Sequence, residues 1–321
     1  MSRIGIGVVG TGRHGSRYAR HLAEGDVRGA RLAAICRRDR EEGGTQAAEW
    51  DAAFHRDARD LAGDPEVEAI IVATPSRFHE EGVTAAAEAG KPVLVEKPLA
   101  PDLATCDRIV NTAEENQIPL MVAQTSRYEG PVRGLIDSLP SLGEIREVSL
   151  LLRSEDRTHM RGVFRPELDD GGALLDSGVH YFDLLPMIAG PIERVWCERH
   201  FIRGTAIDDG YTALLRTSAG ARVVVDMGRW GNSRHETIEV VGERGILLAS
   251  RTPPSLTKVV GRRQVDLPFP DVPGTLVPTM DDFLRVCRGE IEPPIAGADG
   301  RAAVAIVEAC RRSAGAWIRL E

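Results

Sequence analysis

The chain has 321 residues, of which 42% are hydrophobic and 27% are charged, a composition typical of globular proteins with a buried core. This length is enough for two domains. A formal net charge of -8 argues against a nucleic-acid surface, which would need a basic stripe. The apolar runs fall short of the roughly 18 residues of a membrane helix, and the N-terminus lacks a signal-peptide pattern.

Strand and helix patterns alternate over residues 1–123. Short apolar runs predict strands, and the segments between them predict helices. The expected strands are 4–9, 31–36, 54–55, 69–73, 92–95 and 120–123. The expected helices are one that ends near residue 22, and 47–53, 78–89 and 102–116. Repeated βα units of this kind predict a parallel sheet with right-handed crossovers, and six strands make a complete dinucleotide-binding domain.

A G-x-G-x-x-G segment follows the first strand and opens the first helix, which is the context that a dinucleotide-binding turn requires. Gly10 permits the tight turn, Gly12 lets the backbone approach a pyrophosphate, and Gly15 lets helix and strand pack closely. The helix N-terminus offers free N–H groups and a partial positive charge to the phosphates. The expected cofactor contacts in this turn are Gly10, Thr11, Gly12, Arg13, His14 and Gly15.

The end of the second strand indicates which dinucleotide is bound. NAD sites usually place an acid there, which accepts hydrogen bonds from the ribose 2′-OH, whereas this chain has Arg37 and Arg38. A guanidinium can bind a 2′-phosphate through paired hydrogen bonds. We therefore predict NADP(H) over NAD(H). The alternative is that both arginines are surface charges and that Asp39 contacts the ribose.

Glu96, Lys97 and Pro98 follow the fifth expected strand. In open α/β sheets, ligands bind at the carboxyl ends of the strands. Pro98 restricts the backbone, so the Lys97 ammonium is held on a stiff turn where it could take part in catalysis. The alternative is a solvated charge pair at a strand end. We expect Glu96 to fix the turn or Lys97.

Residues 124–321 show a different pattern. Successive strand-like segments joined by tight turns predict a largely antiparallel sheet. The expected strands are 145–153, 192–201, 210–217, 221–227, 236–241 and 246–249. The expected helices are 135–139, 280–287 and 299–316, and the proline-rich segment 251–278 is expected to form loop and edge strand. The predicted fold is an α/β Rossmann domain followed by an α+β domain with an open sheet.

One further helix, expected over residues 171–183, begins at a glycine pair and carries a second candidate site. Asp176 and His180 are four residues apart, so they share one helix face, and Asp183 lies one turn beyond His180. A histidine that a carboxylate orients suits proton transfer near neutral pH. The alternatives are surface residues or an incomplete metal site.

Cysteine usage indicates a reducing compartment. The cysteines are scattered without a C-x-x-C pair, at Cys36, Cys106, Cys197, Cys287 and Cys310. This spacing is typical of reduced thiols and offers no zinc site. We therefore expect a cytoplasmic protein that holds no metal ion and binds neither nucleic acid nor membrane.

Taken together, these segments resemble the Gfo/Idh/MocA family, named for glucose-fructose oxidoreductase and inositol dehydrogenase, over nearly the whole chain. Each motif alone is weak evidence for the family, whereas the combination of motifs is specific for it. The matching motifs are the glycine-rich turn, Ala73-Thr74-Pro75 with His79, the A-G-K-x-V-x-x-E-K-P pattern over 89–98, Arg127-Tyr128, Gly171-Gly172 followed by Asp176, His180 and Asp183, and the hairpin ending at 241–245.

The resemblance implies a dinucleotide-binding Rossmann domain over residues 1–123, and a substrate-binding domain over 124–321 that also forms homodimers or homotetramers. It implies that Lys97 and His180 act on the reacting oxygen while Asp176 helps to place it. The implied substrate contacts are Lys97, Arg127, Tyr128, Asp176 and His180. The implied cofactor contacts outside the glycine-rich turn are Arg37, Arg38, Thr74, Pro75, His79, Glu96 and Lys97.

The expected activity is that of an NADP(H)-dependent dehydrogenase, or the matching reductase, acting on a CH–OH group of a sugar, inositol or related polyol. His180 would take or give the proton, and the charge of Lys97 would stabilise the developing alkoxide. The alternatives are a glycosidase that uses the cofactor for a transient oxidation, and a non-catalytic NADP-binding regulator. A regulator should lose the Lys–Asp–His set, which this chain keeps.

Two features depart from the family pattern or add to it. Ser76 and Arg77 stand where the family often has an asparagine near the nicotinamide. The segment 154–165 is rich in arginine. Its members Arg157, Arg161 or Arg165 could meet an acidic or phosphorylated substrate, and the alternative is that they are loop and surface charges.

Overall fold

The computed structural model describes residues 3–155, 172–202, 204 and 206–320. The chain forms two compact units. The first comprises Met1–Gln124 and Gly274–Arg301, and the second comprises Thr125–Pro273 and Ala302–Glu321. Residues 274–301 are expected from the sequence in the second domain, but they pack with the first unit.

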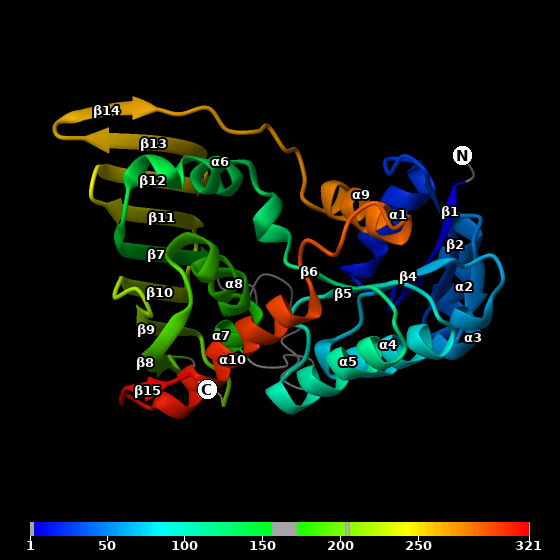
Figure 1. Ribbon diagram of the computed structural model, residues 1–321. Coiled ribbons are helices and arrows are strands. Elements are labelled where there is room, and N and C mark those ends of the chain that lie inside the picture. Colours follow the sequence, from blue (N-terminus) through cyan, green and yellow to red (C-terminus); the bar gives the residue numbers. More distant parts are fainter. Residues whose placement is uncertain (1–2, 156–171, 203, 205, 321) are drawn as a thin grey trace. The chain divides into compact units, whose positions relative to one another are not determined.

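The first unit, over its described residues, is built on a six-stranded parallel sheet of order β3-β2-β1-β4-β5-β6, as predicted (Figure 1). Its strands are β1 (Ile4–Val9), β2 (Ala30–Cys36), β3 (Ala53–His55), β4 (Ala69–Val72), β5 (Val93–Glu96) and β6 (Leu120–Ala123). The residues of β4, β5 and β6 are all buried, and all of them except Glu96 at the end of β5 are apolar, as expected for strands of a parallel sheet that is covered on both faces. The strand order reverses between β1 and β4, the place where ligands bind in folds of this kind.

The connecting helices are α1 (Gly15–Glu24), α2 (Arg40–Glu49), α3 (Ala58–Gly63), α4 (His79–Glu88) and α5 (Leu103–Glu115). The position predicted for the second helix, 47–53, is wrong because α2 begins at Arg40. Asp39 caps this helix by accepting a hydrogen bond from the N–H of Glu42 (2.9 Å). The short helix α3, which Asp57 caps, is absent from the prediction.

Residues 274–301 contact the edge strand β6 of the first unit's sheet, where Met121 and Ala296 form an isolated antiparallel bridge. The N–H of Val122 on β6 donates to the carbonyl of Ile295 (2.8 Å). Helix α9 (Leu276–Cys287) precedes this contact and helix α10 (Gly297–Ser313) follows it. Hydrophobic periodicity predicts both helices, but it does not reveal which sheet they accompany.

The second unit, as far as it is described, is built on a nine-stranded sheet of order β14-β13-β12-β11-β7-β10-β9-β8-β15. Its neighbouring strands pair antiparallel except β7 with β10, so the prediction of a largely antiparallel sheet is confirmed. The strands are β7 (Ile145–Glu155), β8 (Ile192–His200), β9 (Gly210–Thr217), β10 (Arg222–Gly231), β11 (His235–Gly242), β12 (Gly245–Thr252), β13 (Pro254–Val260), β14 (Arg263–Asp266) and β15 (Ile318–Arg319). The two-residue strand β15 is too short to leave a pattern in the sequence.

Helices α6 (Gly130–Ser138), α7 (Gly172–Asp176) and α8 (Gly178–Ala189) cover one face of this sheet (Figure 1). In the central strand β7, alternate side chains such as Leu150 and Leu152 are buried, and those between them are partly exposed. The core of the second unit therefore lies between this face and the three helices.

The single helix predicted over 171–183 is instead two helices. Helix α7 ends at Asp176, Ser177 lies outside regular structure, and α8 begins at Gly178. A Cβ on Gly178 would lie 3.1 Å from the hydroxyl oxygen of Tyr211 on β9, so the start of α8 closely approaches the sheet. Asp176 and His180 therefore stand on either side of a break and not on one regular helix.

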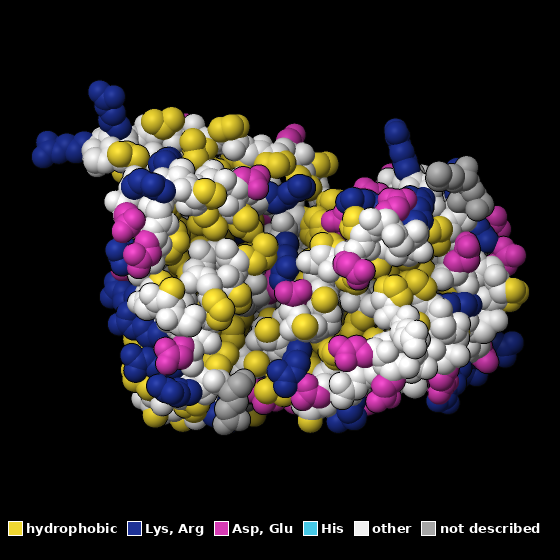
Figure 2. Space-filling view, in the orientation of Figure 1, with side chains coloured by type: hydrophobic (Ala, Val, Ile, Leu, Met, Phe, Trp, Pro, Cys, Tyr) yellow, Lys and Arg dark blue, Asp and Glu magenta, His cyan; other side chains and the backbone are white. Residues whose placement is uncertain are grey.

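The visible surface carries charges of both signs. Lys and Arg side chains stand at the tip of the β13–β14 hairpin, and acidic and basic groups are interspersed over the first unit (Figure 2). Across the described ranges, the helices are too short or too polar to cross a bilayer.

Gly15→Ala is expected to lower the free energy of unfolding by about 1–3 kcal/mol, because the added methyl group would collide with the Gly10 carbonyl oxygen. Gly44→Ala is the matched control. A Cβ on Gly44, within α2, would meet nothing within 4 Å, so this change should stabilise the chain by up to about 1 kcal/mol. Urea denaturation followed by circular dichroism measures both values. Equal effects of the two changes would contradict the close packing of α1 on the turn.

Candidate active site

The glycine-rich turn lies at the carboxyl end of β1, beside the end of β4. Gly10 has a φ of 92°, which favours glycine, and its N–H donates to the carbonyl of Cys36 on β2 (2.9 Å). A Cβ on Gly10 would lie 2.7 Å from Thr74, just past β4. A Cβ on Gly12 would meet nothing within 4 Å among the described atoms, so the backbone there is open to a ligand.

The groups around this turn fit a dinucleotide. The hydroxyl oxygen of Thr74 is buried without a hydrogen-bond partner in the described part of the chain, so a polar ligand group would satisfy it. Helix α1 begins at Gly15 directly after the turn, so the positive end of its dipole faces the turn, while the N–H groups of Ser16 and Arg17 donate to the carbonyls of Gly12 and His14. Arg13 is exposed on the turn. Thr11, by contrast, is buried and donates its hydroxyl to Gln46 (2.7 Å), so its side chain supports the turn.

Basic and aromatic side chains meet near the end of β2. The guanidinium of Arg38 lies 4.2 Å from the ring centre of Phe78, and that of Arg77 lies 5.1 Å from the same ring. The Arg38 side chain is 71% exposed, and its guanidinium lies 3.7 Å from Glu81. An exposed cation stacked on a ring is well placed to meet the adenosine end of a dinucleotide.

Arg37 is more enclosed than Arg38. Its guanidinium donates to the carbonyl of Thr11 and forms an ion pair with Glu42 on α2. Asp39, the alternative ribose contact, uses one carboxylate oxygen to cap α2. The end of β2 therefore presents two arginines together with two acids that lie very close to them in the sequence.

Glu96 joins the glycine-rich turn to the segment that carries Lys97. Its side chain is buried at the end of β5. One carboxylate oxygen accepts a hydrogen bond from the hydroxyl of Tyr18 on α1 (2.6 Å) and another from Nε2 of His14 (2.7 Å). The other oxygen accepts from the N–H of Lys97 (3.0 Å). The carboxylate thus ties the backbone of Lys97 to the start of α1.

The pKa of Glu96 is low despite its burial. Burial by itself raises the pKa of a carboxyl group. The contacts with His14 and Tyr18, together with the positive charge of Lys97, outweigh burial and lower the pKa of Glu96 from 4.5 to about 2. Glu96 is therefore ionised near neutral pH, and it can only accept hydrogen bonds, so Nε2 of His14 must carry the proton that it donates.

His79 lies beneath this edge and contacts two loops. Its ring is buried, with Nε2 at 2.9 Å from the carbonyl of Thr74 and Nδ1 at 3.1 Å from the carbonyl of Leu99. The loop after β4 is thereby held against the segment after β5. His79 is therefore placed to support these two loops and not to contact the cofactor directly. Pro75, on the loop after β4, is exposed.

In the second unit, Arg127 and Asp183 bind each other. The two carboxylate oxygens of Asp183, which is buried on α8, accept hydrogen bonds from Nε and Nη2 of Arg127 (2.7 and 2.6 Å). The adjoining Tyr128 is buried as well. A bidentate pair of this kind orients both groups, so it anchors the helix that carries His180.

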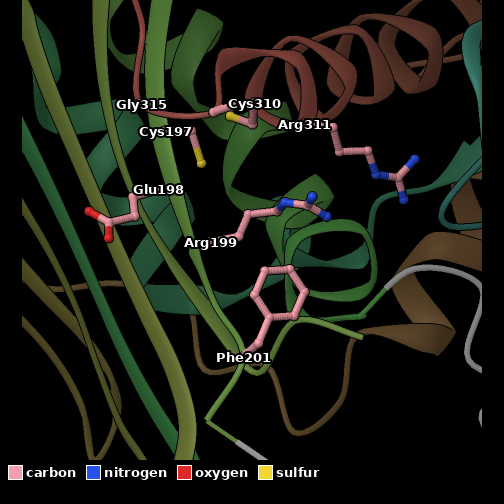
Figure 3. A pocket seen from close by; sticks show the side chains of 8 residues that line it. Cys197, Glu198, Arg199, Phe201, Cys310, Arg311 and Gly315 are labelled. Carbon is pink, nitrogen blue, oxygen red and sulfur yellow. The ribbon is translucent and has the colours of Figure 1, made fainter. Parts of the chain in front are cut away.

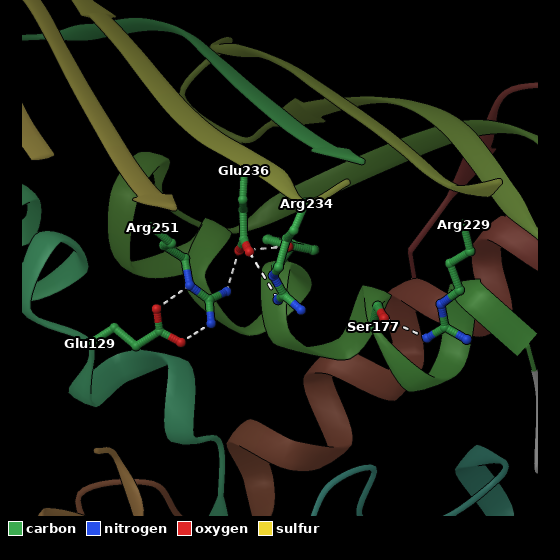
Figure 4. Close-up of polar contacts among 7 residues, drawn as sticks. Glu129, Ser177, Arg229, Arg234, Glu236 and Arg251 are labelled. Carbon is green, nitrogen blue, oxygen red and sulfur yellow. Dashed lines mark hydrogen bonds and ion pairs between the residues drawn. The ribbon is translucent and has the colours of Figure 1, made fainter. Parts of the chain in front are cut away.

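Arg229 is a candidate site residue that is not among those predicted from the sequence. Its guanidinium, from β10, donates to the carboxylate of Asp176. It also donates to the hydroxyl of Ser177 (Figure 4). The Asp176 side chain is half-exposed, and that of Arg229 is mostly buried. A lone arginine near the end of a strand carries no sequence signal, since the residues it contacts lie about fifty positions earlier.

A second buried cluster holds α8 against the sheet (Figure 4). The hydroxyl of Tyr181 donates to the carboxylate of Glu236 (2.7 Å), which also pairs with Arg251 and with Arg234 (3.2 Å). Arg251 makes a further ion pair with Glu129. Burial raises the pKa of Glu236 and lowers that of Arg251 to about 10. Because Tyr181 follows His180, this cluster fixes the chain next to the candidate proton carrier.

A cavity of about 410 Å³ lies between β8 and the end of α10 (Figure 3). Among its lining groups are the thiols of Cys197 and Cys310 and the guanidinium of Arg199, which lies 5.1 Å from the ring centre of Phe201. The described residues that line it include none of the predicted site residues. It therefore adds nothing to the candidate active site.

The predicted site residues divide between the units. The cofactor residues and Lys97 belong to the first unit, and Asp176, His180, Arg127 and Tyr128 belong to the second. Gly171 and the three arginines of the predicted substrate loop, Arg157, Arg161 and Arg165, lie outside the described residues.

Both parts of the chain match known families. Residues 4–124 match an oxidoreductase family with an NAD-binding Rossmann fold. Residues 132–248 match the GFO/IDH/MocA C-terminal domain. These two matches cover the sheet that carries the glycine-rich turn and most of the sheet that carries Arg229 and Glu236.

Individual proteins resemble the chain over nearly its full length. It is 32% identical to inositol 2-dehydrogenase 1 of Saccharopolyspora erythraea, over 97% of this chain and 94% of that protein. It is 27% identical to myo-inositol 2-dehydrogenase of Thermotoga maritima, over 96% of this chain and 95% of that protein. The solved WlbA dehydrogenase of Bordetella pertussis, in complex with NADH and UDP-GlcNAcA, matches with a TM-score of 0.85 at 25% identity and 99% coverage of both chains.

Glu96→Gln is expected to reduce the acid dependence of stability. Because the folded-state pKa of about 2 lies below the ordinary 4.5, the carboxylate stabilises the folded chain above about pH 4.5, and this contribution is lost as the pH falls toward 2. The contribution is at most about 3 kcal/mol. Urea denaturation between about pH 5 and pH 3 measures it. Wild type should lose more stability on acidification than the variant, and parallel pH curves would contradict the assignment.

Proposed function

Because the chain belongs to the Gfo/Idh/MocA family of oxidoreductases, we propose that it is an NAD(P)-dependent dehydrogenase, or the matching reductase, acting on a CH–OH group. The proposed substrate is a sugar, inositol or related polyol, and the inositol dehydrogenases among its relatives support this class. The observation that carries the proposal is the buried Glu96 carboxylate. It connects the dinucleotide-binding turn to Lys97 at the ligand-binding edge of one parallel sheet.

In this proposal, side chains of the protein transfer the proton and stabilise the charge that develops during the reaction. When bound, the nicotinamide supplies or accepts the hydride. The ammonium of Lys97 stabilises negative charge that develops on the reacting oxygen. His180 takes or gives the proton of that oxygen, and Asp176, held by Arg229, helps to place the substrate.

The small number of lysines in the chain supports this role for Lys97. Lys97 is one of three lysines in a chain with 40 Lys and Arg residues. The ammonium groups of the other two, Lys91 and Lys258, donate to backbone carbonyls. An arginine stays protonated in proteins, whereas a lysine can exchange a proton. A lysine at position 97 therefore suits a site where a proton moves.

The cofactor proposed is NADP(H) in preference to NAD(H). Arg38 is the main contact proposed for the 2′-phosphate, because it is exposed and its guanidinium is stacked on Phe78. Arg37 is proposed as a second contact for the 2′-phosphate, although its guanidinium is already paired with Glu42. Both replace the acid that NAD sites usually place at the end of the second strand.

The cellular setting is proposed as the cytoplasm, and the assembly as a homodimer or homotetramer. The five cysteines are free thiols, which suits a reducing compartment. The face of the nine-stranded sheet opposite α6, α7 and α8 carries partly exposed apolar residues such as Leu151 and Val224. A second copy of the chain would bury them.

Lys97→Met is expected to lower kcat at least about 100-fold, because the charge that stabilises the reacting oxygen is lost. NADPH affinity should stay within about twofold, and it is measured by nicotinamide fluorescence. The matched control is Lys258→Met on β13, which removes a surface ammonium and should leave kcat unchanged. Turnover is measured across sugars, inositols, uronic acids and nucleotide sugars with both cofactors. A fully active Lys97→Met variant would remove Lys97 from the site.

Arg38→Ala is expected to weaken NADPH binding by about 10-fold or more and to leave NADH binding within about threefold, because only NADPH carries the 2′-phosphate. Fluorescence titration of both reduced cofactors against wild type and variant gives the two dissociation constants. Equal or tighter binding of NADH by the wild type would overturn the cofactor proposal, as would an unchanged NADPH affinity in both Arg38→Ala and Arg37→Asp.

A further inference from the structure

The Arg37–Glu42 pair lies where the 2′-position of the adenosine ribose is expected. Arg37 donates to the carbonyl of Thr11 within the glycine-rich turn and pairs with the carboxylate of Glu42. The Arg37 side chain is mostly enclosed, whereas that of Glu42 is 61% exposed. The carboxylate can therefore move away from Arg37 into solvent, while Arg37 stays beside the turn.

The start of α2 fixes Glu42 opposite Arg37. Its N–H donates to the side chain of Asp39, which caps the helix (2.9 Å). Its acidic side chain is also stabilised by the positive end of the helix dipole. The neighbouring Glu41 lies in the same first turn and is exposed.

We propose that Glu42 determines cofactor specificity as a counter-ion that the 2′-phosphate of NADP(H) must displace from Arg37. The inference rests on the proposed function. A 2′-phosphate carries up to about two negative charges, so it is repelled by Glu42 and must compete with it for the guanidinium. The 2′-OH of NAD(H) is neutral, so Glu42 does not repel it, and NAD(H) need not displace Glu42 from Arg37.

Glu42 and Arg38 therefore act in opposite directions. Arg38 favours the phosphate, and Glu42 opposes it by occupying the second arginine. An exposed ion pair contributes little free energy, so Glu42 should change the preference by a modest factor, about 3- to 10-fold. The chain is then expected to bind both cofactors. Its affinity for NADP(H) should exceed that for NAD(H), but by a smaller factor than Arg37 and Arg38 would give without Glu42.

The test compares the dissociation constants of NADPH and NADH for wild type, Glu42→Gln, Glu41→Gln, Arg37→Ala and the double variant Arg37→Ala/Glu42→Gln. Glu42→Gln should tighten NADPH relative to NADH by about 3- to 10-fold. Glu41→Gln removes the same charge one residue away and should change the ratio by less than about twofold. In the Arg37→Ala background, Glu42→Gln should also have less than about a twofold effect, because its partner is gone.

Three results would overturn the proposal. The first is a ratio in Glu42→Gln within about twofold of wild type, and the second is an equal change in Glu41→Gln, which would indicate a general charge effect. The third is a selective loss of NADH affinity, which would show that Glu42 contacts the ribose directly. Failure of the proposed function is a separate outcome, because wild type would then bind neither nicotinamide cofactor.

Discussion

The buried carboxylate of Glu96 is the interaction on which the first unit's site depends. It accepts hydrogen bonds from His14 and Tyr18 at the start of α1 and from the backbone of Lys97. A buried acid without partners would be neutral, and this one stays ionised because its contacts outweigh burial. One charged group thus sets the position of the dinucleotide-binding turn relative to the lysine in the same unit.

In the second unit, buried carboxylates with charged partners likewise hold α8 in place. Asp183 and Glu236 are buried acids, and each is satisfied by an arginine from a different element, Arg127 and Arg251. Paired buried charges cost desolvation energy and gain directional contacts, so they hold a helix in one orientation. His180 directly precedes Tyr181, whose hydroxyl donates to Glu236, and lies one helical turn before Asp183, while Asp176 is held from β10 through Arg229.

The sequence predicts those parts of the molecule whose signal is local. The parallel strands appear as apolar runs, and the glycine-rich turn and the Lys97 segment are contiguous motifs. The start of α2 is missed because it depends on an Asp39 cap, and Gly43 and Gly44 obscure the helical pattern. Arg229 and Glu236 are missed because each meets partners about fifty residues away. Such contacts exist only once the sheet has formed, and no periodicity records them.

The central claim is that a hydride passes between the nicotinamide and a carbon that bears a hydroxyl group. The most direct measurement is mass spectrometry of the nicotinamide after incubation of wild type and NADP+ with polyols and sugars deuterated at their C–H positions. The account predicts that reduced cofactor is released with one deuterium, in equal amount to a keto product. Cleavage of a glycoside with the cofactor returned to its starting redox state would contradict it, and so would reduced cofactor that carries no deuterium.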